Sequence, residues 1–196
     1  MKIKYLLVLY LLLLPFVSVK SQSYEKGDHN FSFGYGAPTL NSLAFSIYKN
    51  FDNYKVTGFG AYHAKYGFAA SDNIEIGINA NLSNNVMSYN QTLWNVTDIN
   101  SLNYTSLDIN ARVNLHFGNS AEFDPYIGII LGYNSTSATW SSTDTNFIET
   151  KVSGFIPLGA EFTLGARYYF SQHVGIYGEV GFAQSLAQAG IVFQLY

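Results

Sequence analysis

Apolar and polar residues alternate along most of this chain, and the alternation is clearest between residues 158 and 182. Successive strand residues point to opposite faces, so the pattern predicts strands with one apolar face and one polar, glycine-bearing face. A turn at residues 171–173 separates two such strands. Glu161 and Arg167 share their face with Gly159 and Gly165. Charge beside glycine is typical of a membrane barrel, whose apolar side meets lipid and whose polar side fills a crowded lumen.

The same alternation recurs along the chain and predicts eight strands. Strands of about ten residues match a tilted crossing of the bilayer, and closure is required because an open edge in lipid leaves backbone groups unpaired. Long and short connections alternate, as in outer-membrane barrels with short periplasmic turns. We therefore expect an all-β fold, an eight-stranded antiparallel up-and-down transmembrane β-barrel. The predicted strands are residues 30–36, 58–70, 74–83, 107–117, 126–136, 158–170, 174–182 and 186–196.

Three long connections, at residues 37–57, 86–104 and 137–156, are predicted to be external loops. Within the first, the stretch from Leu40 to Phe51 has apolar residues at helical spacing, which indicates a short amphipathic helix capped by Asn41 or Ser42. This helix either covers the barrel mouth or lies at the membrane interface, or it binds a ligand or partner. Trp94 and Trp140 in the other two loops are candidates for contact with an extracellular partner, or anchors at the interface.

The inward register predicts a polar network inside the barrel. An eight-stranded barrel is just wide enough for its own side chains, and an unpaired buried charge is costly. Opposite charges at middle depth should therefore pair and plug the lumen; a narrow diffusion pore is the alternative. The predicted lumen residues are His63, Lys65, Glu75, Asn79, Asp108, Asn110, Arg112, Asn114, His116, Glu161, Arg167, Tyr177 and Glu179.

The first 21 residues are typical of an export signal. Lys2 and Lys4 precede an apolar core that is too short to span a membrane as a helix, and small residues favour cleavage before Gln22. The two expected parts are a signal peptide, residues 1–21, and a barrel domain, residues 22–196. Removing the signal leaves seven basic and 13 acidic residues, so nucleic acid is not expected as a partner. The chain has no cysteine, so disulfides cannot contribute to its stability.

Several motifs resemble the outer membrane protein β-barrel domain family, the small OmpA/OmpX-like eight-stranded group. They are the stretches PYIG at residues 125–128, GARYYFS at 165–171, EVGF at 179–182 and the end of the chain at 190–196. The resemblance implies the outer membrane of a Gram-negative bacterium, insertion by the barrel assembly machinery, contact with outer-membrane lipid and a monomer. Family members usually end with an aromatic residue on the lipid-facing register, whereas Tyr196 falls on the polar register.

No catalytic, cofactor or metal motif stands out, so we expect no enzyme activity and no cofactor. No HExxH or paired-cysteine spacing is present, and no histidine lies beside an outward serine motif of the kind that a lipid-active site needs. A lipid A-modifying enzyme stays a second alternative. Lipocalin-like barrels are disfavoured because they line their interior with apolar residues. The sequence therefore favours a structural or surface-interaction role.

Overall fold

The computed structural model describes residues 24–118, 120 and 122–196. Eight antiparallel strands pair in sequence order and close into a barrel, β1 pairing with both β2 and β8. The expected signal peptide lies outside the described residues. The strands are β1 (His29–Gly36), β2 (Asp52–Ser71), β3 (Ile74–Leu93), β4 (Val96–His116), β5 (Phe123–Ser142), β6 (Thr150–Tyr169), β7 (Val174–Phe182) and β8 (Ala187–Leu195).

The predicted strand number and faces are confirmed, but two of the three predicted long loops are wrong, and the first loop ends earlier than expected. Most of residues 86–104 and 137–156, and the end of 37–57, belong to strands β2 to β6, which are 20 or 21 residues long. At about 3.3 Å per residue these strands reach about 65 Å, whereas the nine residues of β7 reach about 30 Å. Trp140 therefore lies within β5 rather than in a loop.

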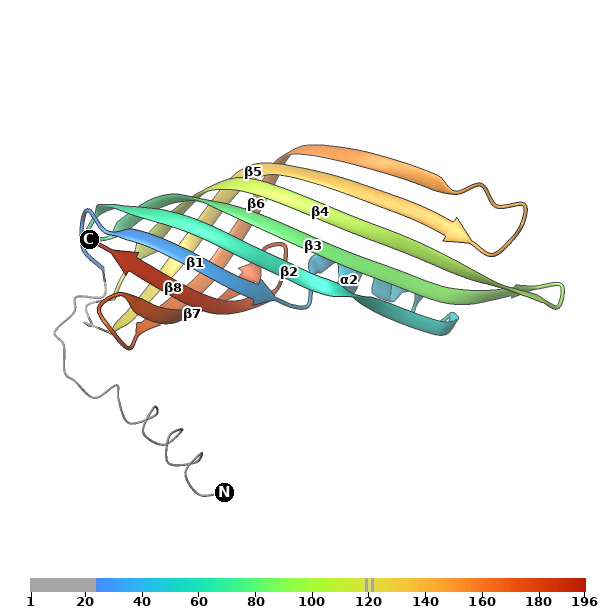
Figure 1. Ribbon diagram of the computed structural model, residues 1–196, viewed down its shortest axis with the longest axis horizontal. Coiled ribbons are helices and arrows are strands. Elements are labelled where there is room, and N and C mark those ends of the chain that lie inside the picture. The colour runs from blue at the N-terminus through green and yellow to red at the C-terminus, as the bar shows by residue number, and fades with distance from the viewer. Residues whose placement is uncertain (1–23, 119, 121) are drawn as a thin grey trace, which may run out of the picture.

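The extra strand length forms an open sheet that continues beyond the barrel, as Figure 1 shows. We call it the sheet extension; it comprises residues 52–60 of β2, 84–93 of β3, 96–105 of β4, 135–142 of β5 and 150–156 of β6. It cannot close, because β1 pairs only with residues 61–68 of β2 and β7 only with residues 162–169 of β6. A bulge between β5 and β6, at Gly132/Asn134, separates the barrel from the extension on that edge.

The outward face of the strands changes character where the barrel becomes the extension. Around the barrel it carries large exposed apolar side chains such as Ile78, Ile109 and Leu131. Farther out on the same face of β3 and β4, Asn and Thr side chains bond to one another, as Asn84 does with Thr105 at 3.0 Å. An apolar belt suits lipid and an Asn/Thr surface suits water. The belt therefore marks the part of the molecule that spans a bilayer.

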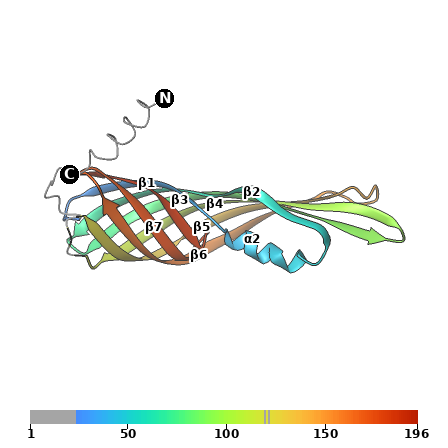
Figure 2. The same cartoon turned by 90° about the horizontal axis from the view of Figure 1, so that it is seen from below.

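The predicted helix is present but shorter than expected. It consists of α2 (Leu40–Ala44) followed by the 3-10 turn η1 (Phe45–Tyr48). Its N-cap is Thr39, whose hydroxyl accepts from the backbone N–H of Ser42 at 3.1 Å, rather than Asn41 or Ser42 itself. Figure 2 shows α2 against one face of the sheet extension. In the described part of the chain no helix has the length and apolar character needed to cross a membrane.

The strand ends include a two-residue turn between β3 and β4 and the end of β8 at Leu195. Trp94 and Asn95 join β3 to β4 with φ of 52° and 63°, the left-handed pair that a two-residue hairpin needs. Trp94 is 95% exposed at this tip. At the other end of the barrel β8 stops at Leu195, so Tyr196 lies beyond the ladder, and its hydroxyl donates to the carbonyl of Gln172 at 2.9 Å. Although Tyr196 continues the polar register of β8, its ring therefore lies outside the lumen.

Candidate functional site

Two regions of the molecule gather chemically capable side chains: the barrel lumen and the inner face of the sheet extension. The same register supplies both, because residues alternate without interruption along β3 and β4. Positions that point inward between the barrel strands therefore continue onto one face of the extension. This face is covered at its base and open toward its tip.

Glu179 is the centre of the lumen network. Its side chain is 1% exposed. Its Oε1 forms ion pairs with Lys65 Nζ at 2.8 Å and with Arg112 Nη2 at 2.6 Å. Tyr126 donates its hydroxyl at 2.6 Å, and Gln188 donates its amide at 2.7 Å. These partners come from β2, β4, β5 and β8, so one carboxylate joins strands on all sides of the barrel.

A second ion pair lies beside the first. Arg167 donates from both terminal nitrogens to Glu75, at 2.7 and 2.8 Å, in a bidentate geometry. Asn114 also donates to Glu75, at 2.7 Å. Arg167 Nη1 lies 3.7 Å from Oδ2 of Asp124. The other carboxylate oxygen of Asp124 lies 2.7 Å from Nδ1 of His116. Among the described lumen residues the formal charges of these clusters balance, three carboxylates facing two arginines and one lysine.

The structure places all the predicted lumen residues inward, but it does not join them all. Asp108 bonds to Ser106 at 3.1 Å, and Glu161 accepts from the backbone N–H of Gln184 at 3.2 Å. Neither forms one of the ion pairs found among the described residues. Asn79, Asn110 and Tyr177 are buried beside the network, with Lys65 Nζ lying 4.3 Å from the centre of the Tyr177 ring.

Sequence reasoning missed several members of the network, and three of them bear on its chemistry. Asp124 lies between the predicted strands 107–117 and 126–136, and Tyr126 is not among the predicted lumen residues, although both share the inward register of Gly128. The third is Ser185, in the β7–β8 connection. Its hydroxyl lies 3.1 Å from Nε2 of His63, whose Nδ1 lies 2.8 Å from Oδ1 of Asn81. No local pattern marks this serine, because the fold brings it from 122 residues away.

An aromatic cluster covers the base of the open inner face. Phe45 of η1 is buried against Met87, Tyr89 and Leu102 of the sheet extension. Tyr48 stacks on Tyr89 with 5.3 Å between ring centres. Burial raises the pKa of the Tyr89 phenol, which therefore stays protonated. The helix thus packs directly on the aromatic side chains at the base of this face.

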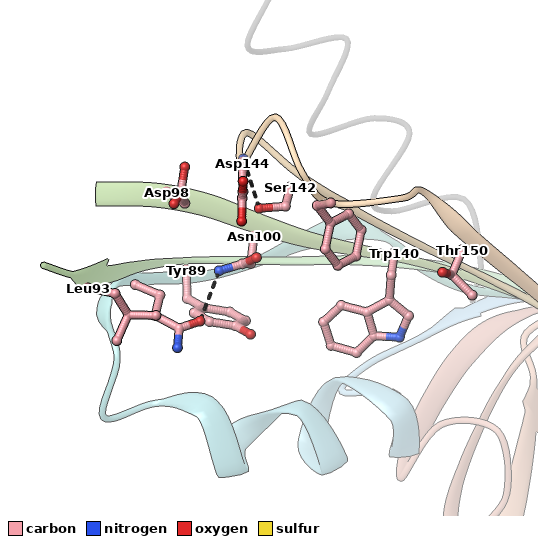
Figure 3. Close-up of a pocket in the computed structure, with 10 residues that line it drawn as sticks. Tyr89, Leu93, Asp98, Asn100, Trp140, Ser142, Asp144 and Thr150 are labelled. Carbon is pink, nitrogen blue, oxygen red and sulfur yellow. Dashed lines mark hydrogen bonds between the residues drawn. The ribbon is translucent and has the colours of Figure 1, made fainter. Parts of the chain in front are cut away.

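Beyond the helix the face opens into a pocket of about 510 Å³ (Figure 3). Leu93 and three rings, Tyr89, Trp140 and Phe147, provide its apolar surface. Its other side chains carry amide, hydroxyl or carboxylate groups: Gln91, Asp98, Asn100, Ser142, Asp144 and Thr150. Trp94, the other loop candidate, does not line this pocket.

No set of three or more His, Cys, Asp or Glu side chains within the described residues is arranged to hold a metal ion. The lumen carboxylates are instead held by arginine, lysine and amide donors.

No protein-family model matches the chain, and no curated protein matches its sequence. Among solved structures, the attachment invasion locus protein Ail of Yersinia pestis is 11% identical, with a TM-score of 0.49 over 87% of this chain and 99% of Ail. The N-terminal barrel of Pseudomonas aeruginosa OprF is 17% identical, with a TM-score of 0.39 over 87% of this chain and 98% of that domain. A designed transmembrane β-barrel is 14% identical, with a TM-score of 0.42 over 89% of this chain and 99% of the design.

These likenesses are remote and say nothing about activity. The resemblance to the small outer-membrane barrel family, drawn above from sequence motifs, stays a prediction. The function proposed below rests on the protein's own side chains.

Proposed function

We propose that this protein is an integral outer-membrane barrel whose lumen is sealed and whose sheet extension is a surface for interaction outside the cell. The single observation that carries the proposal is the contrast between its two halves. Inside the belt, charged groups satisfy one another across a narrow lumen. Outside the belt, the same inner face opens into a pocket.

Placement in a bilayer follows from the exposed apolar belt. Side chains such as Phe33, Ile76 and Val180 lie about half exposed around the barrel. Burying this surface in lipid is favourable, whereas exposing a continuous belt to water promotes aggregation. Short turns lie at one end and the extension at the other, which by the usual orientation of such barrels puts the extension outside the cell.

The sealed lumen follows from the cost of separating the buried ion pairs. Removing a partner from a buried pair costs about 3–5 kcal/mol, so an open state that parts Glu179 from Arg112 and Lys65 is rarely populated. We therefore favour interaction at the surface, rather than diffusion through the lumen, as the function of this protein.

Single-channel recording tests this directly. Refolded protein, checked by its heat-dependent shift on a gel, is inserted into a planar bilayer. We expect no stable conductance steps. Steps that change when Arg112 is neutralised would make the protein a small pore instead.

Orientation and processing have separate tests. An epitope tag inserted between Trp94 and Asn95, at the tip of the β3–β4 hairpin, should be stained by antibody on intact cells. Staining only after permeabilisation would reverse the proposed orientation. Mass spectrometry of the purified protein should give a mature chain that starts at Gln22.

One observation favours a second candidate, a serine hydrolase. Ser185, His63 and Asn81 are hydrogen-bonded in the order of a nucleophile, a base and an orienting group. Ser185 is nevertheless 1% exposed, at the outer end of the lumen, and a nucleophile must reach its substrate. Covalent labelling of Ser185 by a fluorophosphonate probe, lost in His63→Ala, would establish this activity; absence of labelling in the folded protein would dismiss it.

A further inference from the structure

We infer that the pocket at the tip of the sheet extension binds a neutral oligosaccharide. The inference rests on the proposed function, because it needs the extension to face the outside of the cell. Cross-strand pairing builds the pocket in rows on one face. Gln91 pairs with Asp98, and Tyr89 pairs with Asn100, which pairs in turn with Ser142. Trp140 pairs with Thr150 in the next row.

Two of the three pocket rings, Tyr89 and Trp140, are held by aromatic neighbours before any ligand arrives. Tyr89 is buried against both Tyr48 and Phe51, whose ring centres lie 5.3 and 4.7 Å from its own. Tyr48 also holds Trp140 edge-on at 6.2 Å. Aromatic rings with fixed faces suit the C–H-bearing faces of sugar rings, and fixing them in advance reduces the entropy lost on binding.

The polar part of the pocket needs a ligand with both donors and acceptors. The only bond between its two amides, from Asn100 Nδ2 to Gln91 Oε1, is long at 3.4 Å, and each amide carries further donor and acceptor capacity. Hydroxyl groups donate and accept, so a sugar can satisfy amides, hydroxyls and carboxylates together. A volume of about 510 Å³ lies within the usual range of about 300–1,000 Å³ for small-molecule sites.

Charge decides between neutral and charged ligands. Among the described residues that line the pocket, Asp98 and Asp144 are the charged ones, so an anionic or sulfated glycan is repelled. An organic cation is the competing occupant. Both carboxylates, however, already accept protein donors: Asp98 from Thr143 Oγ1 at 3.2 Å, and Asp144 from the backbone N–H of Asn146 at 2.8 Å. An ammonium group, which only donates, leaves the remaining N–H donors of Asn100 and Gln91 without acceptors.

Tryptophan fluorescence gives a direct readout, because the chain has two tryptophans. Trp94→Phe removes the one outside the pocket and leaves Trp140 as the reporter. The mature protein carrying this change is refolded into phosphatidylcholine nanodiscs. It is titrated with maltopentaose, chitopentaose and mannopentaose, with a sulfated heparin tetrasaccharide, and with spermidine. Soluble starch presents the glucose chain of maltopentaose as a polymer and tells whether internal segments bind as well as free ends.

We expect a saturable change in Trp140 emission with at least one neutral pentasaccharide, and none with the sulfated tetrasaccharide. Asn100→Ala should weaken that binding at least tenfold while leaving the heat-dependent gel shift unchanged. Asn103→Ala, on the opposite face of β4, is the matched control and should bind normally. This control separates loss of a pocket contact from a general effect of strand substitution.

Two results overturn the inference. One is the absence of a saturable change with all three pentasaccharides up to 10 mM, a ceiling set at roughly the weakest affinity of interest. The other is saturable binding of spermidine that Asp98→Asn abolishes, which makes the occupant an organic cation. Neither result bears on the expected absence of conductance steps in the planar bilayer. Failure of this inference is therefore distinguishable from failure of the proposed function.

Discussion

Replacing Glu179 by glutamine removes the one carboxylate that Lys65 and Arg112 share. The Glu179 side chain is 1% exposed, and both cations approach the same oxygen, at 2.8 and 2.6 Å. Glutamine has the same shape, so no cavity forms, but it leaves two buried cations without a counter-charge. Breaking a buried ion pair from one side costs about 3–5 kcal/mol, and we expect a loss of this size in the free energy of unfolding.

The loss can be measured by urea unfolding of the refolded barrel in phospholipid vesicles, followed by tryptophan fluorescence and by the gel shift. If the slope of the unfolding transition is the same in both proteins, the difference between their urea midpoints gives the difference in the free energy of unfolding. Lys65→Met in the Glu179→Gln background removes one of the two unpaired cations. We therefore expect the double variant to recover about 1–2 kcal/mol, within the usual coupling between neighbouring charges.

Glu122→Gln is the matched control. Glu122 is exposed and bonds only weakly to the Tyr168 hydroxyl, at 3.2 Å, so its loss should be within about 0.5 kcal/mol. The reasoning would be refuted by a Glu179→Gln variant as stable as the Glu122→Gln variant. Such a result would mean that water enters the lumen and solvates the two cations, which would revive the pore.

Three further changes test other parts of the structure. Ile78→Arg should destabilise the barrel in vesicles by about 2–4 kcal/mol, whereas Ile99→Arg should cost less than about 1 kcal/mol. The two side chains are similarly exposed (58% and 50%), but only Ile78 lies in the apolar belt. Equal losses would mean that the membrane-spanning part extends to Ile99. Gly165→Ala should cost about 1–3 kcal/mol in the same unfolding assay, since its added Cβ would lie 2.6 Å from a ring atom inside the lumen; a neutral result would show a looser core. Phe45→Ala should expose residues 40–51 to limited proteolysis by removing a buried ring, while Ile47→Ala, at a position 75% exposed, should not; equal cleavage would mean that Phe45 does not hold the helix.

The lengths of the strands were the least predictable part of the fold. In β4 the outward face of residues 96–104 is mostly polar, since Asn103 and Ser101 replace the Leu and Ile of the belt and Ile99 alone stays apolar. A strand that passes from lipid into water must change its outward residues, so the alternation that identifies membrane strands stops at the boundary while the backbone ladder continues. Asn, Ser and Thr then resemble a loop in composition.

The lumen site was predictable as a set of residues but not as a set of pairs. Charge on the inward register was enough to identify Glu179, Arg112 and Lys65. Depth along tilted strands then decides which charges meet, and this depends on the register between strands. Asp124 was missed because proline beside it resembles a turn, yet β5 already begins at Phe123.

The sequence by itself determined which face of each strand meets lipid and which meets the lumen, because a period of two is a local property of the backbone. It also determined that eight such strands exist. Only the tertiary structure decided which side chains meet: Glu179 receives donors from residues 53 and 67 positions away, and His63 meets a serine 122 positions away. The open pocket is likewise a product of the fold, because strands of unequal length leave part of the inner face without strands opposite it.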